Sequence, residues 1–291
     1  MDGGGNLYGV TTFGGANGSG TSFELTRGAD GWTEAILHSF CSPPDCSDGY
    51  APGFAPLLDS KGDLYGTAGD TAYELSPGPS GWMETVLYTF CSQPNCADGS
   101  DPHTLIRDSA GNFYGPAESG GGADGGVIFT LRSKPSGGWV YHILYEFTHD
   151  GAPDAIALHN GALYGNTVGC EVGQCGTIFQ IAASGGRIQR NTLYVFANSD
   201  DGATPEGNLA FDNAGNMYGA AGFGGAICGC GVVFELTPGA GGTWQYQLIH
   251  DFDDQDGALP QYGVVYHAGR LFGTTLGGGQ YGVGVVFEIT P

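Results

Sequence analysis

A short motif, an aromatic residue followed by glycine, recurs six times along the chain and constrains its fold more than any other feature. The aromatic residues are Tyr8, Tyr65, Tyr114, Tyr164, Tyr218 and Phe272. Successive copies are separated by 57, 49, 50, 54 and 54 residues, and each is followed by a glycine-rich loop and a β-branched or aromatic run. A repeat of this length and composition is typical of the blades of a β-propeller.

Each copy is predicted to form four short antiparallel strands, denoted a to d in chain order. In the second copy we expect them at 55–59, 63–68, 71–76 and 84–90. The first copy lacks strand a and the last lacks strand d, so 22 strands are expected. With 56 glycines and no long apolar period of 3.6 residues, helices should be almost absent. The prediction is an all-β protein, a single β-propeller domain over residues 1–291 with six blades, although five or seven remain open.

The fifth copy carries a fuller pattern. It consists of Asp201-Gly202-Ala203-Thr204-Pro205, Gly215-Asn216-Met217-Tyr218-Gly219, Gly224-Gly225 and Val233-Phe234-Glu235-Leu236-Thr237-Pro238. This pattern resembles the Gloeo/Verruco tandem repeat of bacterial "choice-of-anchor" surface proteins. The resemblance implies an exported bacterial protein, often tethered by a C-terminal sorting segment, and implies no defined activity. The chain departs from that expectation by ending at Thr290-Pro291 without an anchor.

The cysteines point to an oxidising compartment. All eight lie in close pairs, namely Cys41/Cys46, Cys91/Cys96, Cys170/Cys175 and Cys228/Cys230. Disulfides in an extracellular or cell-surface protein are favoured over zinc thiolates. Because Cys228 and Cys230 are so close in sequence, cross-pairing with Cys170/Cys175 stays open. The sequence begins at Met1 in what reads as an a–b turn, so we expect an export signal and one further strand upstream of it.

Charge restricts the partners. Eight Lys and Arg stand against 30 Asp and Glu, a formal net charge of -22. Nucleic acid is therefore disfavoured, as are anionic membranes and polyanionic substrates. No apolar segment suggests membrane insertion. A neutral polysaccharide or oligosaccharide, or a bound cation, fits better, and we expect a monomer.

Loop parity selects one face of the propeller. In an antiparallel unit the d–a and b–c loops share one end, and these loops hold every cysteine, the Asp-Gly steps and the Gly-Gly segments. Irregular loops on a rigid scaffold concentrate binding residues. Within the d–a loop, the residue after the proline differs in each copy. It is Gly53, His103, Asp154, Glu206 or Gln261.

These varying positions supply the candidate catalytic groups. Asp154 and Glu206 on neighbouring blades form a pair of carboxylates suited to glycoside hydrolysis, with His103 as a third acid, base or orienting group. The alternative is that they are hydrated rim residues. Substrate binding is predicted for Gln261, Glu118, Glu171, Tyr50, Phe223, Tyr262 and Tyr281.

The acidic loops have two interpretations. The Asp of an Asp-Gly step favours a turn, since its side chain can accept hydrogen bonds from nearby backbone. Calcium is the alternative, with Asp200, Asp201, Asp253 and Asp256 as ligands, although no EF-hand spacing exists. No cofactor is otherwise required. The tryptophans, His38, His250 and the strand-c glutamates are expected to be structural.

Three functional hypotheses follow. The leading one is a secreted propeller that binds a neutral glycan at the disulfide-bearing face and hydrolyses it if the paired carboxylates suit. The second is a non-enzymatic extracellular binding or adhesion module. The third is a polysaccharide lyase using His103 and a tyrosine, which is weakened because Arg107 is the only basic residue near that loop. Fold alone does not choose among them.

Overall fold

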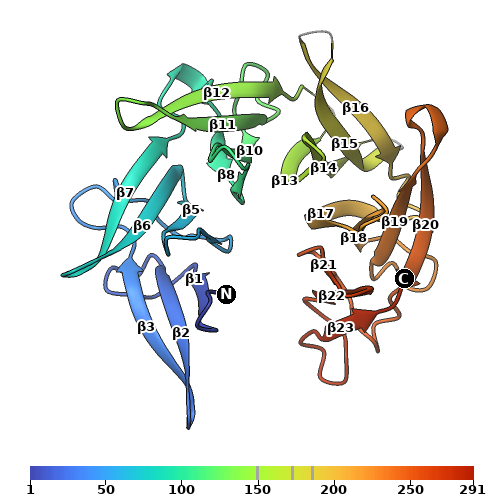
Figure 1. Ribbon diagram of the computed structural model, residues 1–291. Coiled ribbons are helices and arrows are strands. Elements are labelled where there is room, and N and C mark those ends of the chain that lie inside the picture. Colours follow the sequence, from blue (N-terminus) through green and yellow to red (C-terminus); the bar gives the residue numbers. More distant parts are fainter. Residues whose placement is uncertain (149–150, 172–173, 185–186) are drawn as a thin grey trace. The chain divides into compact units, whose positions relative to one another are not determined.

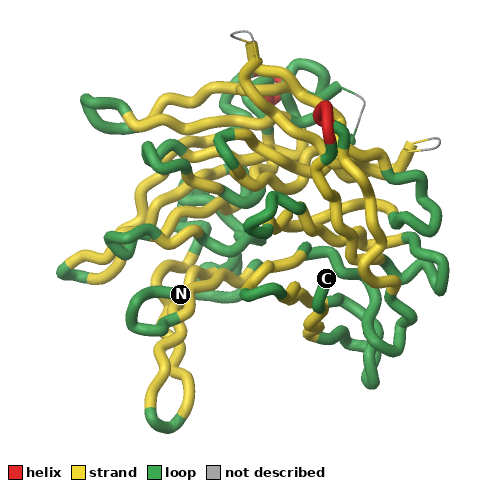
Figure 2. The backbone as a smooth tube through the Cα atoms, turned by 45° about the vertical axis from the view of Figure 1, so that its right-hand side comes forward, coloured by secondary structure: helices red, strands yellow, loops and turns green. Residues whose placement is uncertain are grey.

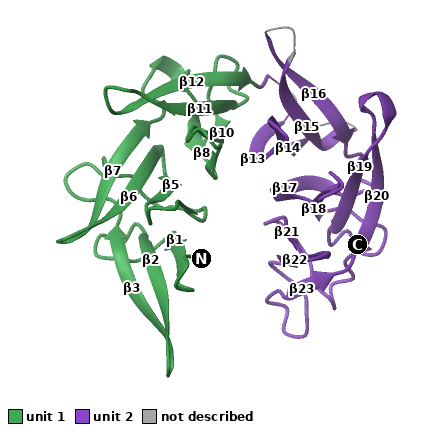
Figure 3. Cartoon of the chain, viewed as in Figure 1, with its two compact units in different colours: residues 1–146 green, residues 147–291 purple. Residues whose placement is uncertain are grey.

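The computed structural model describes all residues except 149–150, 172–173 and 185–186 (Figure 1). Its strands form six small antiparallel sheets. They fall into two compact units, residues 1–146 and 147–291, with three sheets in each (Figure 3). Each sheet corresponds to one copy of the repeat.

Unit 1 contains the first three sheets. The first is β1 (Leu7–Thr11), β2 (Thr21–Gly28) and β3 (Gly31–Ser39). The second is β4 (Leu57–Leu58), β5 (Leu64–Ala68), β6 (Thr71–Gly78) and β7 (Gly81–Thr89). The third is β8 (Ser100–Pro102), β9 (Ile106–Arg107), β10 (Phe113–Ser119), β11 (Val127–Ser133) and β12 (Trp139–Glu146). A short 3-10 turn, η1 (Pro94–Cys96), precedes β8.

Unit 2 contains the other three. The fourth sheet is β13 (Ala152–His159), β14 (Ala162–Glu171), β15 (Gln174–Ser184) and β16 (Arg187–Val195). The fifth is β17 (Ala203–Phe211), β18 (Met217–Phe223), β19 (Val232–Pro238) and β20 (Trp244–Asp251), with η2 (Ala240–Gly242) between its last two strands. The sixth is β21 (Val264–His267), β22 (Arg270–Thr274) and β23 (Val286–Ile289).

The strand pattern follows the prediction closely. Among the described residues, the first sheet has no strand a and the sixth has no strand d. The structure has 23 strands instead of 22 because strand a of the third sheet is split into β8 and β9, both paired with β10. The hairpin of β6 and β7 is longer than the predicted strands 71–76 and 84–90, since the pairing continues to Gly78 and Gly81. The short 3-10 segments η1 and η2 are drawn in red among strands and loops in Figure 2.

The aromatic-glycine motif is explained by the pairing of strands b and c. In every sheet the motif glycine lies opposite an aromatic residue: Gly9↔Phe23, Gly66↔Tyr73, Gly115↔Phe129, Gly165↔Phe179, Gly219↔Phe234 and Gly273↔Phe287. A Cβ atom at Gly115 would lie 2.6 Å from the Phe129 ring. The ring therefore covers the glycine, and side chains such as Phe129 and Phe179 are fully buried there.

The tryptophans only partly match their predicted role between blades. Trp82 contacts Tyr8 of the preceding sheet, with ring centroids 6.3 Å apart, and Trp244 contacts Tyr164 in the same way at 6.0 Å. Trp139 instead packs on Phe113 of its own sheet, and Trp32 is 50% exposed. The structural role expected for the tryptophans is thus clearest for Trp82, Trp139 and Trp244.

Candidate functional site

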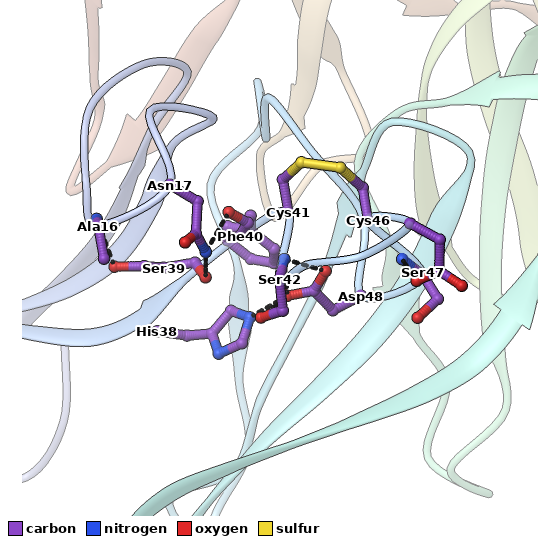
Figure 4. A network of polar contacts seen from close by, with 11 residues as sticks. Ala16, Asn17, His38, Ser39, Phe40, Cys41, Ser42, Cys46, Ser47 and Asp48 are labelled. Atoms are coloured by element: carbon purple, nitrogen blue, oxygen red, sulfur yellow. Dashed lines mark hydrogen bonds and ion pairs between the residues drawn. A yellow bond between two sulfur atoms is a disulfide. The ribbon is translucent and has the colours of Figure 1, made fainter.

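The aspartate of each described Asp-Gly step holds together the loop between strands d and a. In the first loop, the Asp48 carboxylate accepts hydrogen bonds from the Ser42 amide at 2.8 Å and the Ser42 hydroxyl at 2.8 Å. His38 Nε2 lies 3.1 Å from the same carboxylate (Figure 4). The Cys41–Cys46 disulfide spans the loop above this network. The aspartate therefore organises the turn, as the first interpretation predicts.

The same arrangement recurs in the other loops. Strand-d residues Tyr88, Tyr194 and His250 contact the carboxylates of Asp98, Asp201 and Asp256 at 2.7, 2.9 and 2.8 Å. Burial raises the pKa of these carboxyls, but the hydrogen bonds they accept outweigh it and hold each pKa below its usual value. His38 and His250 thus serve the scaffold. Asp150 lies outside the described residues.

The calcium ligands proposed from sequence have protein partners of their own. The Asp201 carboxylate accepts bonds from the Ala197 and Ser199 amides, the Ser199 hydroxyl and the Tyr194 hydroxyl. Asp253 Oδ1 accepts the Gln255 and Asp256 amides. For Asp201, Asp253 and Asp256 these contacts support a structural role, and calcium binding by them or by Asp200 stays a prediction.

All four cysteine pairs form disulfides. The bonds join Cys41 to Cys46, Cys91 to Cys96, Cys170 to Cys175 and Cys228 to Cys230. The cross-pairing that the sequence left open does not occur. Four disulfides indicate an oxidising, extracellular environment. In the described part of the chain, no helix has the length and apolar character needed to cross a membrane.

A cavity of about 540 Å³ lies in unit 1 between the second and third sheets. It is lined by three segments, 50–54 from the d–a loop, 67–70 around the β5–β6 turn and 100–103 at the start of strand a of the third sheet. The d–a and b–c loops both line this cavity, as predicted if they share one face. The volume falls within the range of small-ligand sites.

The cavity exists because one b–c loop is short. Ala68 pairs with Thr71, so Gly69 and Asp70 alone connect β5 to β6. The corresponding loop in the third sheet runs from Ala117 to Val127. A two-residue hairpin turn leaves open the space that a longer glycine-rich loop fills elsewhere. The Tyr50 ring lies against Gly69 and is 48% exposed, so it forms one wall.

His103 is the central polar group of this region. It is 7% exposed, and its ring stacks on Phe54 with centroids 4.3 Å apart. His103 Nε2 lies 3.3 Å from Glu118 Oε2. That hydrogen bond holds the pKa of Glu118 below its usual value, whereas burial raises the pKa of Asp101. Ligand atoms of Asp101, His103 and Glu118 all lie within 4.8 Å of one another.

Three of the predicted site residues therefore come together. His103 and Tyr50 line the cavity, and Glu118 contacts His103. Sequence reasoning missed Asp101, although its position in the repeat and its charge set it apart from the other copies. Asp101 has φ +55, and the positions two residues before the varying residue in three other copies, Ala51, Thr204 and Leu259, share this left-handed backbone. Among these four positions, the third copy alone places a charged side chain.

The predicted catalytic carboxylates, Asp154 and Glu206, belong to unit 2, whereas His103 belongs to unit 1. Asp154 Oδ2 accepts the amide hydrogen of Gly207 at 2.7 Å, next in sequence to Glu206. A Cβ atom at Gly222 would lie 3.7 Å from Glu206 Oε2 and 3.1 Å from Gln261 Cγ, so these two side chains flank one glycine. Strand a of neighbouring sheets thus brings the varying residues near one another in unit 2.

The remaining predicted binding residues are scattered. Phe223, at the end of β18, is 43% exposed, and Tyr262 and Tyr281, on loops of unit 2, are 61% and 80% exposed. The side chain of Glu171 lies outside the described residues. Exposed rings of this kind do not by themselves define a binding platform.

Comparison with known proteins fixes the family. Residues 68–287 match the Gloeobacter/Verrucomicrobia repeat. The chain belongs to this family. No curated protein matches the chain. The family resemblance predicted from the repeat motif is therefore confirmed over most of its length.

Solved structures place this repeat protein among the β-propellers. A catalytically inactive virginiamycin B lyase from Staphylococcus aureus, solved with quinupristin, is 14% identical, with TM-score 0.52 over 99% of this chain and 86% of the lyase. A putative 6-phosphogluconolactonase from Bacteroides uniformis is 12% identical, with TM-score 0.55 over 92% and 74%. A PQQ-bound aldose sugar dehydrogenase from Streptomyces coelicolor is 15% identical, with TM-score 0.52 over 81% and 82%. At such identities the likeness shows the fold alone, and it confirms a six-bladed β-propeller.

Proposed function

We propose that this protein binds a neutral carbohydrate in the cavity between the second and third sheets of unit 1. The observation that carries the proposal is the composition of the cavity wall. Tyr50 presents a half-exposed ring, and Ser100, Asp70 and Asp101 supply hydroxyl and carboxylate oxygens beside it. Sugars expose apolar C–H faces and many hydroxyl groups, so an aromatic face with hydrogen-bond acceptors suits them.

The charge of the cavity supports a neutral ligand over an acidic one. Asp70 and Asp101 line it, and Glu118 lies beside His103. Arg107, the cation that a lyase would need for a uronate, pairs with Asp59 at 3.0 Å and lies over the rings of Tyr65 and Phe113. An anionic sugar would therefore meet negative charge at this site.

The test is a binding screen of neutral oligosaccharides by calorimetry, with a uronate oligosaccharide as the charged comparison. Tyr50→Ala should weaken binding about fivefold or more, since a stacked ring contributes about 1 kcal/mol beyond its buried area. Tyr262→Ala, an exposed tyrosine of unit 2, is the matched control and should bind like the wild type. Equal losses in both variants, or no neutral ligand at all, would contradict the proposal.

A second candidate, separate from the cavity of unit 1, is hydrolysis of a neutral glycan by Asp154 and Glu206 of unit 2. It is favoured by the bond from the Gly207 amide to Asp154, which ties the first carboxylate to the backbone beside the second. Two carboxyl groups on one substrate are what glycoside hydrolysis requires. Release of new reducing ends from neutral polysaccharides should then fall in Asp154→Asn and in Glu206→Gln. Unchanged release in both variants would exclude this pair, and binding without release would leave a non-enzymatic recognition module.

A further inference from the structure

The pairing of two short strands places three metal-ligating side chains on one face of the third sheet. In the β8–β10 ladder, Pro102 lies opposite Ala117 and Ser100 lies opposite Ser119. Asp101 lies between the two paired residues of β8, Glu118 lies between their partners in β10, and His103 directly follows β8. All three residues therefore lie in or directly beside these two paired strands and not on a long loop.

The backbone around these groups is held on both sides. The His103 amide donates to the Pro116 carbonyl at 3.0 Å, and the His103 carbonyl accepts the Thr67 hydroxyl at 3.0 Å. The Asp101 amide donates to Asp70 Oδ1 at 2.9 Å. With its ring stacked on Phe54, His103 is fixed in orientation before any ligand arrives. Such a supporting shell is what a metal centre needs to hold its first ligands.

The spacing of the ligand atoms suits a small divalent ion. His103 Nε2 and Glu118 Oε2 are 3.3 Å apart. Two ligands at bond lengths of about 2.0–2.1 Å in a tetrahedral site lie about 3.3 Å from each other. All three ligand atoms lie within 4.8 Å, so a small side-chain movement brings the Asp101 oxygen to the same centre.

We propose that Asp101, His103 and Glu118 bind one divalent first-row metal ion of the Zn²⁺ class. Two carboxylates offset the two positive charges, and the imidazole nitrogen favours such an ion over Ca²⁺, which takes oxygen ligands. Asp101 and His103 also line the cavity, so the fourth position faces the space where a ligand hydroxyl or water lies. This site does not depend on the proposed carbohydrate, because the three ligands come from the chain itself.

The experiment is a Zn²⁺ titration of chelator-treated, oxidised protein without a histidine tag, followed by calorimetry. Co²⁺ serves as a second probe, since its visible absorption reports nitrogen and oxygen coordination. We expect one saturable equivalent of Zn²⁺ in the wild type. Asp101→Asn and Glu118→Gln should each weaken binding by about tenfold or more while circular dichroism stays unchanged.

His250→Gln is the matched control. His250 lies 2.8 Å from Asp256, yet this pair belongs to no described three-residue metal cluster. The control should bind Zn²⁺ like the wild type. The proposal is overturned if the wild type binds neither ion, if both carboxylate variants bind as tightly as the wild type, or if His250→Gln loses the site. These readouts involve no glycan, so they separate this inference from the proposed function.

Discussion

Glu84 is a half-buried acid that should make the stability of unit 1 fall as pH rises. In the third and fifth sheets, the same register position holds Tyr141 and Tyr246. Each tyrosine donates its hydroxyl to a loop carbonyl of the preceding sheet, at 2.5 and 2.8 Å. Glu84 has no such bond, and its Oε1 is buried without a hydrogen-bond partner among the described atoms. Burial, together with the charge of Asp48, raises the pKa of Glu84 to about 7.

The sign of the effect follows from the raised pKa. Below about pH 4.5 the carboxyl is neutral in both states, so it has no effect. Between its usual value of 4.5 and about 7 the unfolded chain ionises first, and stability is lost. A difference of this size corresponds to about 3 kcal/mol at about 1.36 kcal/mol per pKa unit. Because the side chain is partly exposed, solvent screening reduces this to about 1–2 kcal/mol.

Glu84→Gln removes the ionisation and should therefore stabilise the protein at pH 8 by about 1–2 kcal/mol and by almost nothing at pH 4. Urea unfolding followed by circular dichroism at both pH values measures this difference. Glu34→Gln is the matched control, since Glu34 occupies the same position of the first sheet and is exposed. Its effect should stay within about 0.5 kcal/mol at both pH values. A pH-independent effect of Glu84→Gln, or a loss of stability at pH 8, would refute the reasoning.

Three further predictions concern the loops and the sheets. Asp98→Asn should lower the free energy of unfolding at pH 7 by about 1–3 kcal/mol, because the buried carboxylate accepts several bonds. Since the folded pKa of Asp98 is lowered, the stability it supplies is present above its unfolded pKa and is lost as pH falls; a difference that persists at pH 2 would contradict this. Reduction of the disulfides should leave the β-sheet circular dichroism intact and lower the melting temperature modestly, since each closes a short loop contributing about 2 kcal/mol; complete unfolding by mild reductant at room temperature would oppose it. Gly115→Ala should cost about 1–3 kcal/mol in urea unfolding because its Cβ would meet the Phe129 ring, whereas Gly53→Ala, with no atom within 4 Å, should be nearly neutral; equal effects would count against the close contact.

The repeat made most of the fold predictable. The spacing of the aromatic-glycine steps defined six units, and the turn residues located their strands, because period and turn chemistry are local properties. The split of strand a into β8 and β9 was not predictable, since it depends on how Ser100–Pro102 pairs with Ala117 and Ser119. The restoration of an upstream strand before Met1 stays a prediction.

The candidate site was only half predictable for a similar reason. Variation after the loop proline singled out His103, because a position that is set by the repeat yet differs between copies is visible in sequence. Its neighbours Phe54 and Asp101 become part of a site only through packing between two sheets. The sequence shows that the Gly69-Asp70 turn is short. It does not show that this short turn leaves a cavity open, because that depends on the space that the longer loops fill in the other copies.

The ring that covers each motif glycine also limits which positions of the repeat can change in sequence. Almost no substitution is possible at the motif glycine, since even one methyl group at Gly219 or Gly273 would strike the opposing ring. The steric limit at this pair explains why the motif is recognisable in all six copies of the repeat. The residue after the loop proline has no such limit, and it is a different amino acid in each copy that has this loop, namely Gly53, His103, Asp154, Glu206 or Gln261.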